Sequence, residues 1–191
     1  MVSFRSSRTA THYQPNQTLR AVFFDRDGTL NVDRGYVHRT EDFEWLPTVR
    51  ETILALNNRD ILVFVVTNQS GVARGYYDER AVQALHRWMN NDLRGLGAHI
   101  DDFRYCPHHP QGLITEYSVD CQCRKPSPGM ITDLLDSWSL DPRQTVLVGD
   151  RATDLLAGQA AHVRSLQVKD GLLLSSLVAP LLSDGLPDAL L

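Results

Sequence analysis

The sequence contains few cysteines: there are three among 191 residues, and all of them lie between positions 106 and 123. An odd and clustered set does not suit a disulfide framework, which needs pairing partners spread along the chain. Long apolar runs are also missing, since none approaches the roughly 20 residues of a membrane-spanning helix. The Leu-rich tail at 171–182 is too short and is interrupted by Ser175, Ser176 and Pro180. We therefore expect no membrane partner and a reducing compartment, which favours a cytoplasmic protein.

A strong excess of one charge is missing as well. Lys and Arg number 19 and Asp and Glu 23, which gives a formal net charge of −4. This balance does not favour nucleic acid as a partner, and no basic run with aromatic residues predicts a groove for single strands. Hydrophobic residues make up 42% and charged residues 22%, as is typical of a soluble globular protein. A chain of this length can bury a sizeable core alone, so we expect a monomer.

The first 19 residues contain Arg5, Arg8 and several Ser and Thr, with no acidic residue before Asp25. A transit peptide can have this composition, but the segment is short and only weakly periodic. We interpret residues 1–19 as a flexible N-terminal extension and residues 20–191 as a single domain. The pattern predicts no function for the extension or for the Leu-rich tail.

Apolar runs with β-forming residues alternate with helical patterns. Residues 21–24 form a wholly apolar run, as expected of a strand buried on both faces. Further strands are predicted at 61–66, 103–105, 145–148 and 166–168. Helices are predicted at 49–58, at 79–94 after the cap residue Asp78, from Pro128 and from Thr153. The alternation predicts an α/β fold: a doubly wound, mostly parallel sheet with helices on both faces.

Acidic residues follow two of these strands. Asp25 and Asp27 come directly after the first strand, and Asp150 follows the strand at 145–148. Because the carboxyl ends of parallel strands meet at one edge of a sheet, we expect these carboxylates to cluster there. An oxygen-rich cluster suits Mg²⁺, which bridges to substrate phosphate. Of two carboxylates two residues apart, one can attack phosphorus, and the other can protonate the leaving oxygen and then activate water.

The cysteines stand beside a histidine pair in a segment, 107–125, that lacks a helical pattern. A Cys-x-His and a Cys-x-Cys motif supply four ligands for a closed tetrahedral zinc site: Cys106, His108, Cys121 and Cys123. A closed site is structural, so the zinc would staple this loop and fix the chain just before Lys125. Two alternatives stay open, namely a set of buried free cysteines and a zinc site that uses His109 in place of His108.

Four short motifs follow one another along the chain. They are Asp25-x-Asp27-Gly28-Thr29, Thr67 after a strand, Lys125, and Gly149-Asp150-x-x-x-Asp154. Their order and spacing resemble the four motifs of the haloacid dehalogenase superfamily. The resemblance implies that Asp25 is the nucleophile of a phosphatase and Asp27 its acid/base. It also implies that Thr67 and Lys125 hold the transferring phosphoryl oxygens.

The same resemblance implies a magnesium site. Its ligands would be the side chain of Asp25, the backbone carbonyl of Asp27 and the side chain of Asp150. Two interpretations of Asp154 stay open: it orients the acidic site without binding the metal, or it is an ordinary acid in the first turn of a helix.

Four stretches narrow the resemblance within the superfamily. They are FFDRDGTLNVDRGYV (23–37), VVTNQSGVARGYY (65–77), YCPHHPQG (105–112) and CQCRKPSPGM (121–130). They are similar to two groups with a zinc loop and no large cap domain, the histidinol phosphatases and, more closely, the heptose bisphosphate phosphatases. The second group implies removal of the 7-phosphate from D-glycero-D-manno-heptose 1,7-bisphosphate, in the synthesis of lipopolysaccharide precursors.

Two alternatives to this activity are weighed. Histidinol-phosphate phosphatase is disfavoured by the Asn31-Val32-Asp33-x-Gly35-Tyr36 stretch and by the expectation that the chain lacks a second catalytic domain. A non-catalytic scaffold that binds sugar phosphates would be expected to have lost Asp25 or Asp27, and both are present.

The resemblance also implies a substrate-binding set. It comprises a sugar-contacting loop at Asp33, Arg34, Gly35 and Tyr36, contacts from Thr67, Asn68, Gln69 and Ser70, and the basic residues Arg124, Lys125 and Arg151. The sequence departs from the family at Arg151, where lysine is common, so its detailed role is open. We expect Arg124 and Arg151 to meet the second phosphate, which is not transferred. Four other histidines show no constellation and are interpreted as surface or core residues: His38, His86, His99 and His162.

Overall fold

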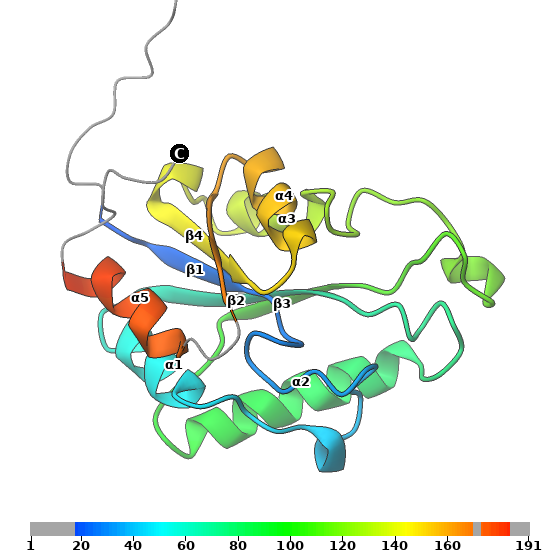
Figure 1. Cartoon of the computed structure of the whole chain (residues 1–191), viewed down its shortest axis with the longest axis horizontal. Coiled ribbons are helices and arrows are strands. Elements are labelled where there is room, and N and C mark those ends of the chain that lie inside the picture. Colours follow the sequence, from blue (N-terminus) through cyan, green and yellow to red (C-terminus); the bar gives the residue numbers. More distant parts are fainter. Residues whose placement is uncertain (1–17, 170–172, 184–191) are drawn as a thin grey trace, which may run out of the picture.

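In residues 18–169 and 173–183, which this computed structural model describes, five parallel strands form one sheet in the order β3-β2-β1-β4-β5 (Figure 1). The strands are β1 (Ala21–Phe24), β2 (Leu62–Asn68), β3 (Asp102–Cys106), β4 (Thr145–Gly149) and β5 (Arg164–Gln167). Phe24 pairs with Val65 of β2 and with Val148 of β4, so the carboxyl ends of the three central strands lie level. The opposite edge carries the connections that lead into the strands, such as 95–101 before β3.

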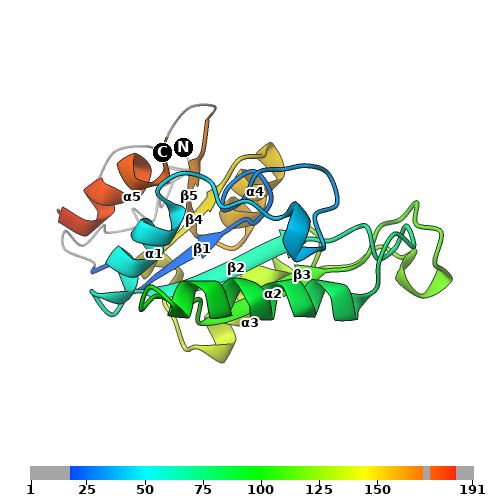
Figure 2. The same ribbon diagram turned by 90° about the horizontal axis from the view of Figure 1, so that it is seen from below.

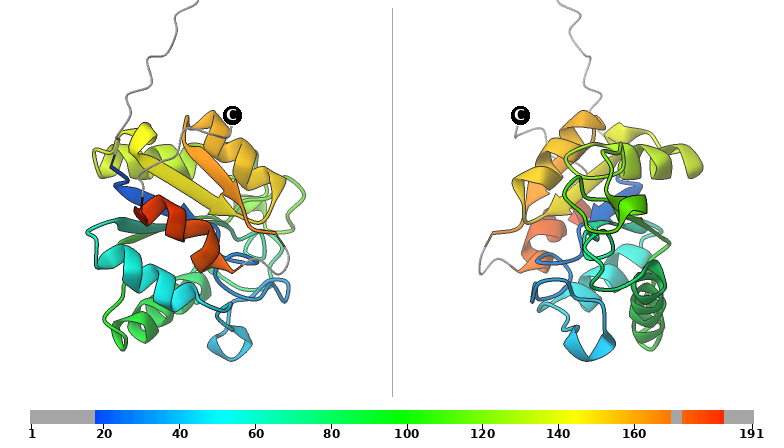
Figure 3. Two further views of the ribbon diagram at one scale, coloured as in Figure 1. Left: turned by 60° about the vertical axis from the view of Figure 1, so that its left-hand side comes forward. Right: turned by 90° about the vertical axis from the view of Figure 1, so that its right-hand side faces the viewer.

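Helices cover both faces of the sheet (Figure 3). One face packs against α1 (Val49–Asn57), α2 (Glu79–Arg94) and α5 (Leu174–Ser183), and the other against α3 (Gly129–Ser137) and α4 (Ala152–Ala160). Short 3-10 turns lie at Thr40–Asp42 (η1), Thr115–Tyr117 (η2) and Pro142–Gln144 (η3). In β1, Val22 and Phe24 enter the first core and Ala21 and Phe23 the second. This alternation explains why the whole strand is apolar, because each face of a parallel sheet is covered.

The longest described helix, α2, lies along β2 and β3 (Figure 2). The side chain of Asp78 accepts a hydrogen bond from the Ala81 amide at 2.9 Å and caps its first turn. Gly95 follows its last residue, as predicted. Its apolar stripe, which includes Leu85, Met89 and Leu93, is buried in the core.

The predicted α/β fold class, with a parallel sheet between two helical layers, is confirmed. Within the described residues no insertion forms a separate cap domain. The predicted element boundaries agree with the structure to within two residues. The helix expected to begin at Pro128 begins at Gly129, whose amide instead donates to the Gln122 carbonyl. The described helices lack the combination of length and apolarity found in membrane-crossing segments.

The structure adds detail at the two ends of the chain that the sequence did not predict. Leu19, placed in the N-terminal extension, is buried in the core, so the folded part includes it. Residues 1–17 lie outside the described residues. The Leu-rich tail, to which no role was given, contains α5, and its Leu174, Val178 and Leu181 pack into the same core as α1.

Candidate active site

A cavity of about 460 Å³ opens at the carboxyl ends of the strands. Apart from Arg34, every residue predicted for catalysis or substrate binding lines it: Asp25, Asp27, Asp33, Gly35, Tyr36, Thr67, Asn68, Gln69, Ser70, Arg124, Lys125 and Arg151. These residues come from loops far apart in the sequence. The level register of β1, β2 and β4 explains their convergence, because each of these strands delivers its following loop to the same edge.

Asp25 and Lys125 form a buried ion pair at the base of this cavity. Their side chains are 9% and 3% exposed, and Lys125 Nζ donates to Asp25 Oδ1 at 2.6 Å and to the Val66 carbonyl at 2.8 Å. Burial raises the pKa of Asp25 to about 7, against the lowering effect of Lys125. Burial alone would lower the pKa of Lys125, but Asp25 and Asp154 hold it above its usual range. The lysine therefore brings a permanent positive charge to the carboxylate.

Asp27 is held by a ring of donors. Arg26, which is fully buried, donates from Nη2 to Asp27 Oδ1 at 3.0 Å and to Oδ2 at 2.9 Å. Asn31 Nδ2 donates to Oδ1 at 3.0 Å and Gln69 Nε2 to Oδ2 at 3.1 Å. These contacts fix the second carboxyl group against the cavity wall, where it can exchange a proton with a bound molecule.

Asp25, Asp150 and Asp154 form a carboxylate cluster whose ligand atoms lie within 4.8 Å of one another. Asp150 Oδ1 is buried without a hydrogen-bond partner, which leaves a free acceptor in the cluster. Gly28 permits this arrangement: its φ is +88°, and a Cβ there would lie 2.4 Å from Asp150 Oδ2. Oxygen ligands with an unused acceptor fit a hard cation such as Mg²⁺.

The contacts of Asp154 bear on both interpretations that the sequence left open. Its Oδ2 accepts from the Arg151 amide at 2.9 Å, as an acid in the first turn of α4 does. Its Oδ1 lies 2.6 Å from Lys125 Nζ. One carboxyl group thus starts the helix and positions the lysine.

Polar side chains at the end of β2 are bonded to neighbouring segments. They belong to Thr67, Asn68 and Gln69. Asn68 exchanges two hydrogen bonds with the backbone of Lys125, both at 3.0 Å, so it aligns the lysine segment with the sheet. Gln69 Nε2 donates to Thr67 Oγ1 at 2.8 Å, while its Oε1 accepts from the Tyr77 hydroxyl at 2.8 Å. The polar groups of this wall are therefore largely fixed before any ligand enters.

The outer wall is formed by the loop after β1. Asp33 Oδ2 accepts from Arg151 Nη2 at 2.7 Å, and Gly35 and Tyr36 line the cavity beside them. Tyr36 has a φ of +55° and packs edge-on against Tyr76, with ring centroids 4.8 Å apart. Arg34, in contrast, lies away from the cavity lining and pairs with Glu44 on the surface.

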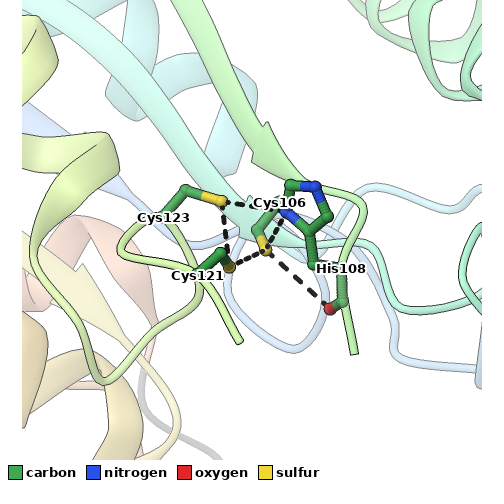
Figure 4. Close-up of side chains that lie close together, drawn as sticks. All are labelled: Cys106, His108, Cys121 and Cys123. Atoms are coloured by element: carbon green, nitrogen blue, oxygen red, sulfur yellow. Dashed lines mark hydrogen bonds between the residues drawn. The ribbon is translucent and has the colours of Figure 1, made fainter. Parts of the chain in front are cut away.

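Three cysteines and one histidine form a second cluster (Figure 4). The Cys106 and Cys121 sulfurs are 3.5 Å apart, and those of Cys121 and Cys123 are 3.3 Å apart. His108 Nδ1 lies 3.3 Å from the Cys123 sulfur and 3.7 Å from that of Cys106. With Zn–S bonds of about 2.3 Å, a tetrahedral site has S–S edges of about 3.8 Å, so these groups are compatible with zinc.

His109 does not join this cluster. Its Nε2 lies 3.3 Å from Arg74 Nη2, and its Nδ1 accepts from the Gln111 amide at 3.1 Å. Arg124 Nη1 donates to the His108 carbonyl at 3.2 Å. The cysteine cluster is therefore tied directly to the cavity wall.

Two residues of the site were missed in the sequence. Arg26 stands between the two aspartates. From the sequence alone it would be interpreted as exposed, because charged side chains are rarely buried. Tyr77 lines the cavity, and Gly71 makes room for it, since a Cβ there would lie 2.2 Å from its ring. Burial raises the pKa of Tyr77 to about 12, so it donates reliably to Gln69. In the sequence, Gly71 was the feature that could have indicated the close packing of Tyr77.

Comparisons with known proteins agree with this geometry. Residues 122–179 match the family described as "HAD-hyrolase-like". The chain is 47% identical to a D-glycero-beta-D-manno-heptose-1,7-bisphosphate 7-phosphatase of Rhodopseudomonas palustris, over 75% of this chain and 79% of the relative. It is 41% identical to a D-glycero-alpha-D-manno-heptose-1,7-bisphosphate 7-phosphatase of Photorhabdus laumondii, over 80% and 84%.

A solved structure is also similar. It is a D,D-heptose 1,7-bisphosphate phosphatase from B. bronchiseptica, complexed with magnesium and phosphate, with a TM-score of 0.73 and 32% identity over 89% of each chain. The order of the four sequence motifs, the parallel sheet and these relatives lead to one conclusion: the chain belongs to the family of the D-glycero-D-manno-heptose-1,7-bisphosphate 7-phosphatases, within the HAD-like hydrolases.

Proposed function

We propose that this protein removes the 7-phosphate of D-glycero-D-manno-heptose 1,7-bisphosphate. The observation that carries the proposal is the buried Asp25, 2.6 Å from Lys125 at the base of a cavity that Asp27 also lines. The relatives named for this substrate supply the substrate class. Histidinol-phosphate phosphatase stays a weaker alternative, to be tested directly.

In the proposed reaction an oxygen of Asp25 attacks phosphorus and forms an aspartyl-phosphate, while the bond from phosphorus to the sugar oxygen breaks. The carboxyl group of Asp27 gives its proton to that oxygen. As a carboxylate it then takes a proton from water, which attacks phosphorus, releases phosphate and restores Asp25. Lys125 and Thr67 hold the transferring phosphoryl oxygens and oppose their negative charge.

The proposed magnesium ligands are the Asp25 side chain, the Asp27 carbonyl and Asp150. When bound, Mg²⁺ neutralises phosphoryl charge and orients the group for in-line attack. Asp154 contributes indirectly, since its carboxyl group holds Lys125 at 2.6 Å. Removal of Asp154 would leave Lys125 paired with Asp25 alone, whereas removal of Lys125 would leave two buried carboxyl groups without their positive partner.

We propose a structural zinc held by Cys106, His108, Cys121 and Cys123. Four protein ligands leave no open position for chemistry. The consequence for catalysis is positional, because Arg124 and Lys125 follow the last ligand directly. We further propose that the protein acts as a cytoplasmic monomer in the synthesis of nucleotide-heptose precursors of lipopolysaccharide.

Phosphate release from a substrate panel tests this function. The panel contains both anomers of heptose 1,7-bisphosphate, fructose 1,6-bisphosphate, histidinol phosphate and an aryl phosphate, each with and without Mg²⁺. We expect the highest kcat/KM on one heptose anomer and loss of activity without Mg²⁺. Preference for histidinol phosphate would support the alternative. Absence of turnover on every substrate would favour a non-catalytic binding protein.

A further inference from the structure

Every hydrogen-bonding group of the Gln69 side chain already has a partner in the protein. The residue is 2% exposed, and its Nε2 donates to Asp27 Oδ2 at 3.1 Å and to Thr67 Oγ1 at 2.8 Å. Its Oε1 accepts from the Tyr77 hydroxyl at 2.8 Å. An amide group offers two N–H donors and one carbonyl oxygen, so each of them is in use. A contact between Gln69 and the substrate would have to compete with these bonds.

The orientation of the Gln69 amide determines where the Thr67 hydroxyl can donate. A hydroxyl group has one proton, and Thr67 Oγ1 accepts from Gln69 Nε2. The proton is therefore left for a group in the cavity, which Thr67 lines. If the amide turned over, its oxygen would face Thr67 Oγ1 and compete for that proton. One amide thus decides whether Thr67 is a donor to a phosphoryl oxygen.

Asp27 favours the present orientation of the amide in only one of its two protonation states. As a carboxylate it accepts an N–H group of Gln69. In the proposed reaction, however, Asp27 carries a proton in the first step, and a protonated carboxyl group needs an acceptor. The other side chains bonded to it offer none. Arg26 can only donate, and the Asn31 amide is fixed by its N–H contact with the Val32 carbonyl at 2.9 Å. A protonated Asp27 therefore favours the reversed amide.

Tyr77 opposes that reversal. Within the described residues Gln69 Oε1 is the one acceptor of its hydroxyl, and a reversed amide would point N–H groups at this donor. Burial raises the pKa of Tyr77 to about 12, so the phenol keeps its proton in the neutral range. The ring is fixed as well, because it stacks on His38 with centroids 4.4 Å apart. Gly71 leaves room for the hydroxyl, which lies 2.6 Å from where a Cβ would be.

We propose that Tyr77 is a positioning residue for the first half-reaction. Through Gln69 it keeps the Thr67 hydroxyl available to the transferring phosphoryl group while Asp27 is protonated. The inference rests on the proposed function. In the second half-reaction Asp27 is a carboxylate and holds the amide itself, so the Tyr77 hydroxyl is needed less. Tyr77 has this role without touching the substrate.

Tyr77→Phe tests the role, because it removes the hydroxyl and keeps the stacked ring. We expect aspartyl-phosphate formation to slow about tenfold, as when a hydrogen bond to a charged oxygen is weakened. Hydrolysis of the aspartyl-phosphate should change little. Single-turnover acid-quench kinetics with phosphate-labelled heptose 1,7-bisphosphate measure both rates. An aryl phosphate should show a similar loss in the formation step, since its phosphoryl group meets the same Thr67. Tyr76→Phe, at an exposed neighbouring tyrosine, is the matched control.

A second background identifies the route. Thr67→Val keeps the approximate shape of a side chain that is 1% exposed and removes its hydroxyl. If Tyr77 acts through that hydroxyl, adding Tyr77→Phe to Thr67→Val should cost less than about threefold more on the aryl phosphate. Losses that multiply in the double variant would show that Tyr77 acts independently of Thr67, and the proposal would be wrong.

Three further outcomes would also overturn the proposal. Loss confined to heptose 1,7-bisphosphate would show a direct contact between Tyr77 and the sugar. Equal slowing of both half-reactions would show general damage to the site, and an unchanged formation rate would show no role. If wild type does not hydrolyse heptose 1,7-bisphosphate, the proposed function is wrong. The aryl phosphate then still tests Tyr77 by the formation rate of Tyr77→Phe.

Discussion

The carboxylate cluster and the cysteine cluster are neighbours, but the protein holds them in different ways. The members of the first lie at the ends of β1 and β4 and in the first turn of α4, and Lys125 supplies an internal cation to Asp25 and Asp154. The members of the second lie at the two ends of a loop whose regular structure, within the described residues, is the single turn η2. The sheet therefore holds the residues of the carboxylate cluster in place. The residues of the cysteine cluster must instead be held together by the ligand groups themselves.

We therefore expect changes in the two clusters to affect different properties: activity for the carboxylate cluster and folding of the loop for the cysteine cluster. A change in the carboxylate cluster should remove activity and leave the sheet intact, because the strands are held by their own ladder and cores. A change in the cysteine cluster should disturb the loop and reach the chemistry through Arg124 and Lys125, which follow Cys123 directly. The first two predictions below test this separation, and the third concerns the stability of the fold.

Asp25→Asn should have the largest effect. It keeps the shape of the side chain and removes the attacking charge, so kcat should fall by roughly 10⁴- to 10⁶-fold, as when other enzymes lose a nucleophile. Zinc content and the far-ultraviolet circular dichroism spectrum should stay those of the wild type. Activity within tenfold of wild type would show that Asp25 is not the nucleophile.

Cys121→Ala should have a smaller effect on activity and a larger one on order. Structural zinc contributes on the order of 10 kcal/mol to local folding, so its loss should make the 107–123 loop sensitive to proteases. Misplacement of Lys125 by about 1 Å should lower kcat/KM by about a hundredfold. Elemental analysis and limited proteolysis measure the change, with exposed Gln122→Ala as the matched control. Wild-type protein purified without chelators and found free of zinc would contradict the proposal.

The smallest expected effect concerns His86, whose protonation should change the stability of the fold alone. Burial, and then the charge of Arg26 3.4 Å away, hold its pKa well below 6.5. The ring also stacks on Phe103 and lies beside Tyr105, neither of which supplies a negative charge. As pH falls below about 6.5 the unfolded chain therefore takes up a proton that the folded chain does not. The free energy of unfolding should decrease by up to about 1.4 kcal/mol per pH unit.

His86→Asn should remove this slope. Urea unfolding between pH 5 and 8 measures the difference between variant and wild type, in which all other titrating groups cancel. Parallel curves for the two proteins would mean that His86 titrates alike in both states. Activity at pH 7.5 should change little, because His86 reaches the site only through Arg26.

The sequence predicted the central strands well because their apolar runs are bounded by polar residues or glycine. The run at 21–24 lies between Arg20 and Asp25, and the strand occupies those four residues. The helix α5 escaped prediction although Leu174, Val178 and Leu181 have helical spacing. Pro180 and two serines weakened the local signal, and its partner surface on α1 lies far away in the sequence. A local sequence pattern cannot show which distant segment a helix packs against.

Prediction of the candidate site was limited in the same way, because local motifs do not show contacts between residues that are distant in the sequence. Motifs placed the acids and the basic residues at one edge, since parallel strands leave no other choice. They did not show that Arg34 turns toward Glu44, because the direction of a loop side chain depends on its neighbours in space. They also did not show that Arg26 is buried, since its acceptors include the Val37 carbonyl, eleven residues away.

The connections that lead into the strands lie at the edge of the sheet opposite the candidate site. The residues that line the cavity lie at or beyond the carboxyl ends of the strands, whereas the turn at Gly95–Gly97, before β3, lies at the opposite edge. Leu96 is 47% exposed there. A fluorophore, affinity tag or solid support attached at this turn would leave substrate entry open, so the fold offers a ready orientation for immobilised use of the enzyme.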